Sequence, residues 1–271
     1  MSGTQFERMR RLSLALAGIQ LADRHRELLS HRCRRLKIDN PASLDALLAS
    51  SEEGDPSARQ RFIGLVTTCY TGFFRNPSHF AIAGERAVEA VRRRGAARLW
   101  SAAAATGEEP YSLAISVIES LHRDDPPVTI VATDINPETM AAAASGEFGE
   151  TALRAFDAER RARFFSEPAG AGRWRVSAHV RRMVQFMPLN LTDAVWPVEG
   201  PFDVILCRNV LMYLEAGHRE SVLRRMASLI GPGGLLILDP AEYPGPAQHL
   251  FGAGKNGVYS PRTLPVETEL I

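Results

Sequence analysis

From residue 97 onward, apolar runs with strand character alternate with segments of helical character. The strand-like runs each end near polar or small residues and cover 98–101, 128–133, 202–207 and 235–238. The helix-like segments between them cover 108–121, a stretch after Pro137, and about 217–230. Strands that alternate with helices along a chain form a mostly parallel sheet covered by helices. This part of the chain is therefore predicted to be an α/β domain.

The first part of the chain has a different pattern. Leucines recur at helical spacing between residues 21 and 36, Asn40-Pro41 ends that helix, and Ser43 opens a second one. We expect an N-terminal helical domain with its linker at 1–85 and the α/β domain at 86–271. Within the latter, short strand-like runs at 174–176 and 183–186 predict a small antiparallel β insertion at about 165–187.

Composition and charge exclude several classes of protein. Lys plus Arg number 32 and Asp plus Glu number 31 among 271 residues, so we expect no nucleic-acid partner. Cys33, Cys69 and Cys207 form no CxxC pair, so neither a metal site nor a disulfide framework is predicted, and a reducing cytoplasm fits. No run of about 18 apolar residues occurs, so no membrane insertion is expected.

The turn after the first strand of the α/β domain is the first candidate binding element. Ala102 to Ala105 precede the sequence Thr-Gly-Glu-Glu-Pro, and small residues let the backbone approach a ligand closely at the carboxyl edge of a parallel sheet. A tight turn with Pro110 in the first turn of a helix is the alternative interpretation. The glycine fingerprint of nicotinamide-dependent oxidoreductases is missing, and there is no P-loop.

Polar residues also follow the next two strands. In doubly wound folds, an acidic residue at the place of Asp134 accepts hydrogen bonds from ribose hydroxyls, although Asp134 could instead cap the following helix. Arg208 and Asn209 leave the 202–207 strand at the same edge of the sheet. Their alternative role is a salt bridge together with a turn-stabilising asparagine.

Two features lie outside the α/β domain. Residues 67–75 alternate polar and aromatic side chains, which fits either a lid over a pocket or a connector between domains. A basic stripe on the first part of the chain is either a solvated helix face or a docking surface for an acidic partner. It consists of Arg24, Arg32, Arg35 and Lys37.

Together these segments resemble the bacterial chemotaxis receptor methyltransferases, the CheR family. The resemblance covers about residues 17–259 and rests on four blocks in the right order. The blocks are Phe73-Phe74-Arg75, the segment from Trp100 to Ser112, Ala132-Thr133-Asp134-Ile135, and Cys207-Arg208-Asn209-Val210 with Tyr213.

The resemblance implies a Rossmann-like methyltransferase domain that binds S-adenosylmethionine and releases S-adenosylhomocysteine. It also implies a small N-terminal all-helical domain and a small antiparallel β insertion. The implied substrate is a set of glutamate side chains on the cytoplasmic helical bundle of a chemoreceptor or related signalling protein, which places this protein in the cytoplasm.

The resemblance also implies the site residues. Arg75 and Tyr213 would lie near the transferred methyl group, Glu108 at the methionine part of the cofactor, and Asp134 at its ribose. The cofactor-binding set implied by the family is Thr71, Arg75, Glu108, Asp134, Asn190, Leu191, Arg208 and Asn209. A glutamate carboxylate is ionised near pH 7, so methyl transfer to it needs alignment and desolvation rather than a general base.

The chain departs from the family pattern at three places. Cys69 stands where the family usually has asparagine, and Asp239-Pro240-Ala241-Glu242 stands for its Gly-His-Ser-Glu. The loop at 166–172 is short, so we expect no tethering by a receptor pentapeptide. Two alternatives follow from these departures: a diverged methyltransferase acting on another substrate, and a weakly active scaffold that binds the cofactor.

Overall fold

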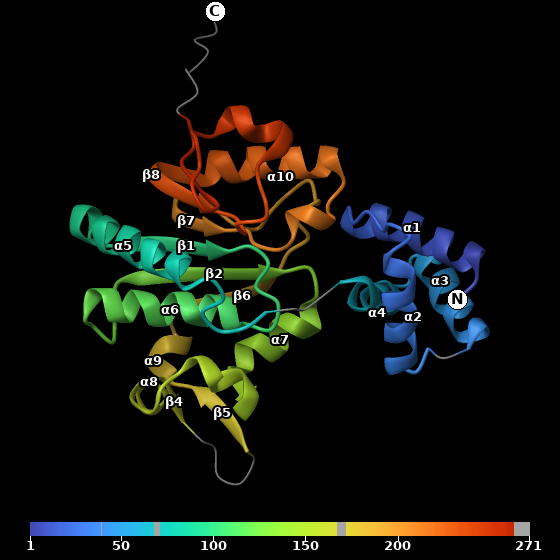
Figure 1. Cartoon of the computed structure of the whole chain (residues 1–271), viewed down its shortest axis with the longest axis horizontal. Helices are drawn as coiled ribbons and strands as arrows, with labels where there is room; N and C mark the ends of the chain where they lie inside the picture. The colour runs from blue at the N-terminus through green and yellow to red at the C-terminus, as the bar shows by residue number, and fades with distance from the viewer. Residues whose placement is uncertain (39, 68–70, 167–171, 263–271) are drawn as a thin grey trace, which may run out of the picture.

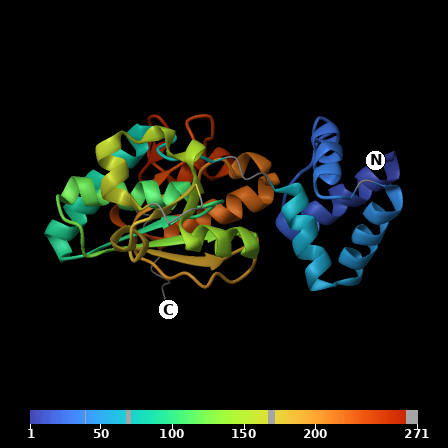
Figure 2. The same ribbon diagram turned by 90° about the horizontal axis from the view of Figure 1, so that it is seen from below.

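The computed structural model describes residues 1–38, 40–67, 71–166 and 172–262. Four helices at the start of the chain form a bundle beside the α/β part, seen at the right in Figures 1 and 2. They are α1 (Gly3–Ala17), α2 (His25–Arg35), α3 (Pro41–Glu53) and α4 (Pro56–Val66). Their buried apolar side chains, among them Met9, Leu48 and Phe62, form a core of their own.

Side-chain caps explain where these helices begin. Asn40 accepts a hydrogen bond from the backbone N–H of Ser43, and Pro41 follows as the first helical residue of α3. The helix therefore starts two residues before the predicted Ser43. Asp55 caps α4 in the same way through the N–H of Ala58.

A six-stranded sheet forms the centre of the α/β part. The strands are β1 (Ala97–Ser101), β2 (Val128–Asp134), β6 (Val184–Pro188), β7 (Phe202–Leu206), β8 (Ile230–Ile237) and β9 (Val258–Tyr259). Their order is β6-β2-β1-β7-β8-β9, and all neighbouring pairs are parallel except β8 with β9. The predicted Rossmann-like α/β fold is thus confirmed.

Helices cover both faces of this sheet. One face packs on α5 (Pro77–Arg94), α6 (Glu108–Leu121) and α7 (Pro137–Ser145), and the other on α10 (Ala216–Leu229) and the 3-10 helix η3 (Gly245–Leu250). Alternate strand residues serve the two faces, so that Leu99 points to the first and Trp100 to the second. Figure 1 shows this arrangement.

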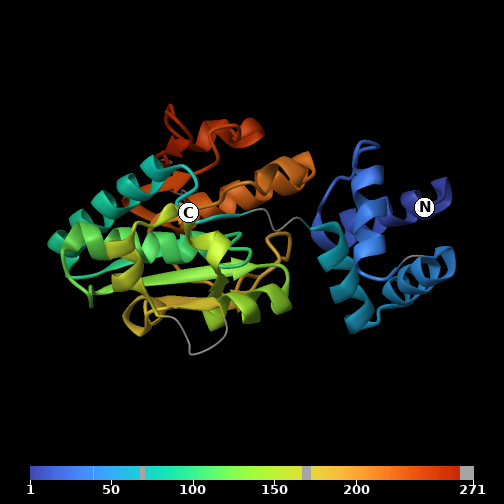
Figure 3. The same cartoon turned by 60° about the horizontal axis from the view of Figure 1, so that its bottom comes forward.

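A second, three-stranded antiparallel sheet is inserted in the α/β part, between α7 and β6 in the chain, and lies at the bottom of Figures 1 and 3. Its order is β3 (Glu147–Gly149), β5 (Arg173–Val176), β4 (Phe165–Ser166). Short helices lie between and after its strands: η1 (Glu150–Ala155), α8 (Ala158–Phe164) and α9 (Ala178–Arg181).

Two predicted boundaries need correction. Residues 183–186 were assigned to the insertion, but Val184–Pro188 forms β6, which pairs in parallel with β2 of the main sheet. The predicted boundary at residue 85 falls inside α5, which packs on β1 and α6. We propose instead that the helical domain ends with α4.

Candidate functional site

A cavity of about 260 Å³ lies between the carboxyl ends of the strands and the N-terminal helices. On the sheet side its wall includes the predicted residues Thr71, Arg75, Asp134, Asn190, Leu191, Arg208, Asn209 and Tyr213. On the helix side it includes Ile19, Leu21, His25, Leu28 and Leu29. The carboxyl edge of a parallel sheet is where α/β proteins bind ligands, so the cavity is the candidate site.

Asp134, the last residue of β2, presents its carboxylate to this cavity. One carboxylate oxygen accepts the N–H of Ala105 at 3.0 Å and the other accepts the N–H of Asn136 at 3.1 Å. Burial raises its pKa despite these hydrogen bonds. The helix cap of α7 is Asn136 and not Asp134, so the alternative role predicted for Asp134 is wrong.

The turn after β1 brings backbone close to the same cavity. Ala102, Ala103 and Ala105 line it, and Ala105 has a positive φ of 45°. Gly107, with φ of 98°, leaves room for α7, because a Cβ atom there would lie 3.0 Å from Cβ of Ala143. The small side chains therefore keep this wall thin and the backbone exposed to a ligand.

The two glutamates that open α6 have different surroundings. Glu108 is buried beside the turn and accepts a 2.6 Å hydrogen bond from the hydroxyl of Thr106. It does not line the cavity, whereas Glu109, which sequence reasoning did not select, does. Burial raises the pKa of both carboxyls.

Glu109 forms a buried ion pair with Arg208. The Nη1 atom of Arg208 lies 3.0 Å from Oε2 of Glu109, and the hydroxyl of Ser101 donates to the other carboxylate oxygen. Nη2 of Arg208 donates to the carbonyl oxygen of Arg75 at 2.6 Å. Arg208 thus joins the end of β7 to the start of α6 and to residues 71–75. It lines the cavity and also forms the salt bridge that was the alternative prediction for it.

Residues 71–75 are fixed by their aromatic side chains. The ring of Phe73 packs edge-on against Phe148, Phe156 and Phe165 beside the small sheet. The backbone N–H of Phe74 donates to the hydroxyl of Ser112 in α6. These contacts hold Thr71 and Arg75 at the cavity wall. Cys69 lies outside the described residues, as does most of the loop predicted to be short.

The turn after β7 carries Asn209 and Tyr213. Asn209 has a positive φ of 58°, and Tyr213 ends the 3-10 helix η2 (Leu211–Tyr213). The carboxylate of Glu242 accepts the N–H groups of Asn209 at 2.8 Å and of Met212 at 3.2 Å. Burial raises the pKa of Glu242. The sequence alone indicated no role for Glu242, because its two contacts join residues 33 and 30 positions apart.

No metal centre is indicated in the part of the chain described here. Among residues 1–38, 40–67, 71–166 and 172–262, no group of three or more His, Cys, Asp or Glu side chains is placed to hold a metal ion. None of the helices in those same ranges has the length and apolar character that a membrane crossing requires.

Comparison with known proteins identifies the family. The family model described as CheR methyltransferase, SAM binding domain, matches residues 70–252. This chain belongs to the CheR methyltransferase family. Its cofactor is S-adenosylmethionine, and it is an S-adenosylmethionine-dependent methyltransferase.

Relatives resemble this CheR-family chain over nearly its full length. Chemotaxis protein methyltransferase 2 of Pseudomonas aeruginosa is 37% identical over 262 residues, which are 94% of this chain and 92% of the relative. The chemotaxis protein methyltransferase of Salmonella typhimurium is 37% identical, over 89% of this chain and 84% of the relative. The Escherichia coli protein of that name is 36% identical, over 89% and 85%.

Proposed function

We propose that this protein transfers the methyl group of S-adenosylmethionine to glutamate side chains of a chemoreceptor-like protein in the cytoplasm. The products are glutamyl methyl esters and S-adenosylhomocysteine. One observation carries the proposal: Arg75 and Tyr213 line the same cavity as Asp134. A guanidinium and a phenol suit a carboxylate acceptor, while Asp134 suits a ribose.

The residues present fit the cofactor. Within the described residues, Asp134 accepts hydrogen bonds from backbone N–H groups alone, which leaves lone pairs for ribose hydroxyls. The thin alanine wall permits close approach, and Thr71, Asn190, Leu191, Arg208 and Asn209 line the rest of the cavity. Glu108 does not line the cavity. We therefore propose that it influences the methionine part of the cofactor indirectly, through its hydrogen bond with Thr106.

The cofactor supplies an electrophilic methyl group, and the protein aligns the acceptor with it. The acceptor carboxylate is already ionised near pH 7 and loses no proton in the reaction. Arg75 would orient this carboxylate, and the hydroxyl of Tyr213 would donate a hydrogen bond to it. The apolar N-terminal wall would exclude water from both reactants.

The acceptor partner is proposed to be an acidic helical bundle, bound without pentapeptide tethering. Arg24, Arg35 and Lys37 of the basic stripe are exposed and available for such docking. Arg32 is half-buried instead, since its Nη1 donates to the carbonyl oxygens of Leu65 at 3.2 Å and Thr67 at 2.8 Å. We therefore assign docking to the three exposed residues and not to Arg32.

Calorimetric titration with S-adenosylhomocysteine tests the cofactor part of the proposal. We expect micromolar binding in the wild type and none in Asp134→Ala, with both proteins folded by circular dichroism. Equal binding by the two proteins would remove Asp134 from the site.

Transfer of labelled methyl to purified chemoreceptor tests the acceptor. Glutamyl methyl esters release methanol in mild alkali, whereas methylated nitrogen does not. We expect alkali-labile label, and its loss in both Arg75→Ala and Tyr213→Phe. Full activity in either variant would contradict the role given to that residue.

A second candidate is a methyltransferase acting on a neutral acceptor, and Asp239 favours it. Although burial works in the opposite direction, hydrogen bonds from Ala241 and Asn209 and the charges of Arg208 and Arg75 lower the pKa of Asp239. This ionised carboxylate stands where the family usually has glycine, and it would weaken the attraction of Arg75 for an anionic acceptor. Alkali-stable label on the product would favour this candidate.

A further inference from the structure

The loop after α1 is joined by backbone hydrogen bonds to the turn that carries Tyr213. The N–H of Gln20 donates to the carbonyl oxygen of Tyr213 at 2.8 Å, and the N–H of Glu215 donates to the carbonyl oxygen of Gly18 at 2.9 Å. Between them, Ile19 and Leu214 form an antiparallel β-bridge. Two segments almost two hundred residues apart are thus paired at the edge of the cavity.

A side chain adds a second connection between the same parts. The amide nitrogen of Asn190 donates to the carbonyl oxygen of Leu16 at 2.9 Å. The N–H and the hydroxyl of Thr192 both donate to the amide oxygen of Asn190, at 3.1 Å and 2.8 Å, which fixes the orientation of the amide. The amide nitrogen of Asn190 therefore binds the N-terminal helices and its amide oxygen binds Thr192, while the residue also lines the cavity.

Gly18 is the point of closest approach. Its φ of 64° ends α1 in the left-handed conformation. A Cβ atom on this residue would lie 2.5 Å from Cγ2 of Thr192 and 3.2 Å from Cγ of His218. The connection therefore depends on glycine for backbone conformation and for space.

We propose that Gly18 and Gln20 are positioning residues for Tyr213, and that the helical domain completes the methyl-transfer site through them. We name residues 18–20 with 213–215 the interdomain clasp. The clasp fixes the backbone of Tyr213 from the N-terminal side, and Glu242 fixes the start of the same turn from the sheet side. This inference rests on the function proposed for Tyr213.

Gly18→Ala is the first test. The added methyl group collides with Thr192, and we expect kcat for methyl transfer to fall about tenfold or more, which corresponds to about 1.4 kcal/mol. The KM for S-adenosylmethionine should change less, because the hydrogen bonds that hold Asp134 are untouched. Gly95→Ala is the matched control: Gly95 also ends a helix with positive φ, of 79°, but has nothing within 4 Å of an added Cβ atom.

Two further variants separate positioning from a general loss of stability. Thr192→Ser removes the colliding methyl group and keeps the hydroxyl that holds Asn190, so it should restore part of the activity of Gly18→Ala. In a double-mutant cycle, Gly18→Ala should cost little in the Tyr213→Phe background, because both changes act on one residue. Equal activity of Gly18→Ala and Gly95→Ala, or full additivity with Tyr213→Phe, would overturn the proposal.

A second pair of variants keeps the proposal testable if Gly18→Ala does not fold. Gln20→Pro removes the N–H that binds Tyr213, while Gln20→Ala keeps it, and the side chain of Gln20 is exposed. We expect the proline variant alone to lose activity and to show faster hydrogen exchange at the amide of Glu215. Identical exchange in both variants would refute the clasp.

The exchange measurement needs no methyl acceptor, so it separates this inference from the proposed function. If Tyr213→Phe stays fully active while Gln20→Pro still accelerates exchange at Glu215, the clasp exists as a contact but does not serve catalysis. That outcome would contradict the positioning role and the role of Tyr213 together. If Gln20→Pro loses activity while exchange at the amide of Glu215 stays as slow as in the wild type, the clasp alone is contradicted.

Discussion

The helical bundle and the sheet domain each contain an arginine–glutamate pair, and the two glutamates shift in opposite directions. In the bundle, Nη2 of Arg8 lies 2.6 Å from Oε2 of Glu52, and this hydrogen bond lowers the pKa of Glu52. In the sheet domain, burial raises the pKa of Glu109 although Arg208 lies 3.0 Å away. The same partners therefore give opposite results, and exposure to water decides between them.

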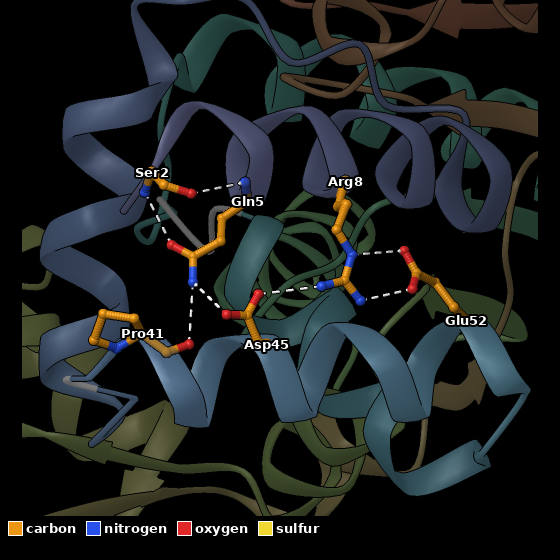
Figure 4. A network of polar contacts seen from close by, with 6 residues as sticks. All are labelled: Ser2, Gln5, Arg8, Pro41, Asp45 and Glu52. Atoms are coloured by element: carbon orange, nitrogen blue, oxygen red, sulfur yellow. Dashed lines mark hydrogen bonds and ion pairs between the residues drawn. The ribbon is translucent and has the colours of Figure 1, made fainter.

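The surroundings of the two pairs explain the difference. Figure 4 shows Arg8 of α1 contacting Glu52 and Asp45 of α3, with Gln5 of α1 beside it contacting Pro41 and Asp45. The side chains of Asp45 and Glu52 are 49% and 39% exposed, so water solvates both carboxylates and the ion pairs add little to stability. The side chains of Arg208 and Glu109 are 2% and 11% exposed. Their mutual attraction mainly offsets the cost of removing both from water.

Removal of Arg208 should produce the largest effect. Arg208→Ala leaves the carboxylate of Glu109 buried without its cation and releases the carbonyl oxygen of Arg75. We expect the free energy of unfolding to fall by about 3–5 kcal/mol. Urea denaturation of the wild type and the variant measures this change. A loss below about 1 kcal/mol would mean that the buried pair behaves like the exposed one.

Asp134 extends the comparison to a half-buried acid whose hydrogen-bond partners, within the described part of the chain, include no arginine. Asp134→Asn should weaken binding of S-adenosylhomocysteine by about 1.5–3 kcal/mol, the usual worth of a hydrogen bond to a charged group. The raised pKa of Asp134 means that wild-type affinity should also decline as the pH falls through that pKa. Titrations across pH 4–8 check this, with Asp134→Asn expected to be flat. A parallel decline in both proteins would assign the pH dependence elsewhere.

The two glutamates should affect stability at opposite ends of the pH range. The pKa of Glu52 is lowered on folding, so its contribution is present above the unfolded pKa and is lost as pH falls through the folded one. The pKa of Glu109 is raised, so its contribution is present below the unfolded pKa and is lost as pH rises through the folded one.

Unfolding curves recorded at several pH values for Glu52→Gln and Glu109→Gln measure these contributions. Glu52→Gln should remove only the loss of unfolding free energy that occurs as the pH falls. Glu109→Gln should remove only the loss that occurs as the pH rises. If both variants remove the same loss, the opposite directions of the two pKa shifts are refuted.

Removal of Arg8 should have the smallest effect. Arg8→Ala breaks two ion pairs whose carboxylates are exposed, and we expect a loss of at most about 1 kcal/mol, which shrinks further in 1 M salt. Denaturation at low and high salt measures it. A loss comparable to that of Arg208→Ala would show that the bundle depends on its surface network.

Local patterns were enough to predict the edge of the sheet where the cavity lies. Helix α6 has the predicted bounds, Asp134 is the last residue of its strand, and Arg208 comes two residues after its strand. Strand β6 was misplaced because a short apolar run looks the same in an antiparallel insertion and in a parallel sheet. Neither the contacts of Glu242 nor the clasp could be predicted, because hydrogen bonds between residues far apart in the chain leave no local pattern in the sequence.

The clasp also limits how this enzyme can be recombined with its relatives. The first 66 residues add apolar side chains to the cavity wall and hydrogen bonds to the turn of Tyr213, so both parts of the chain build the candidate cavity. A chimera that takes its first 66 residues from another protein must therefore keep a glycine at position 18 and a surface that matches Thr192 and His218. Without that match, replacing the first 66 residues would change the position of Tyr213 as well as the surface that docks the acceptor.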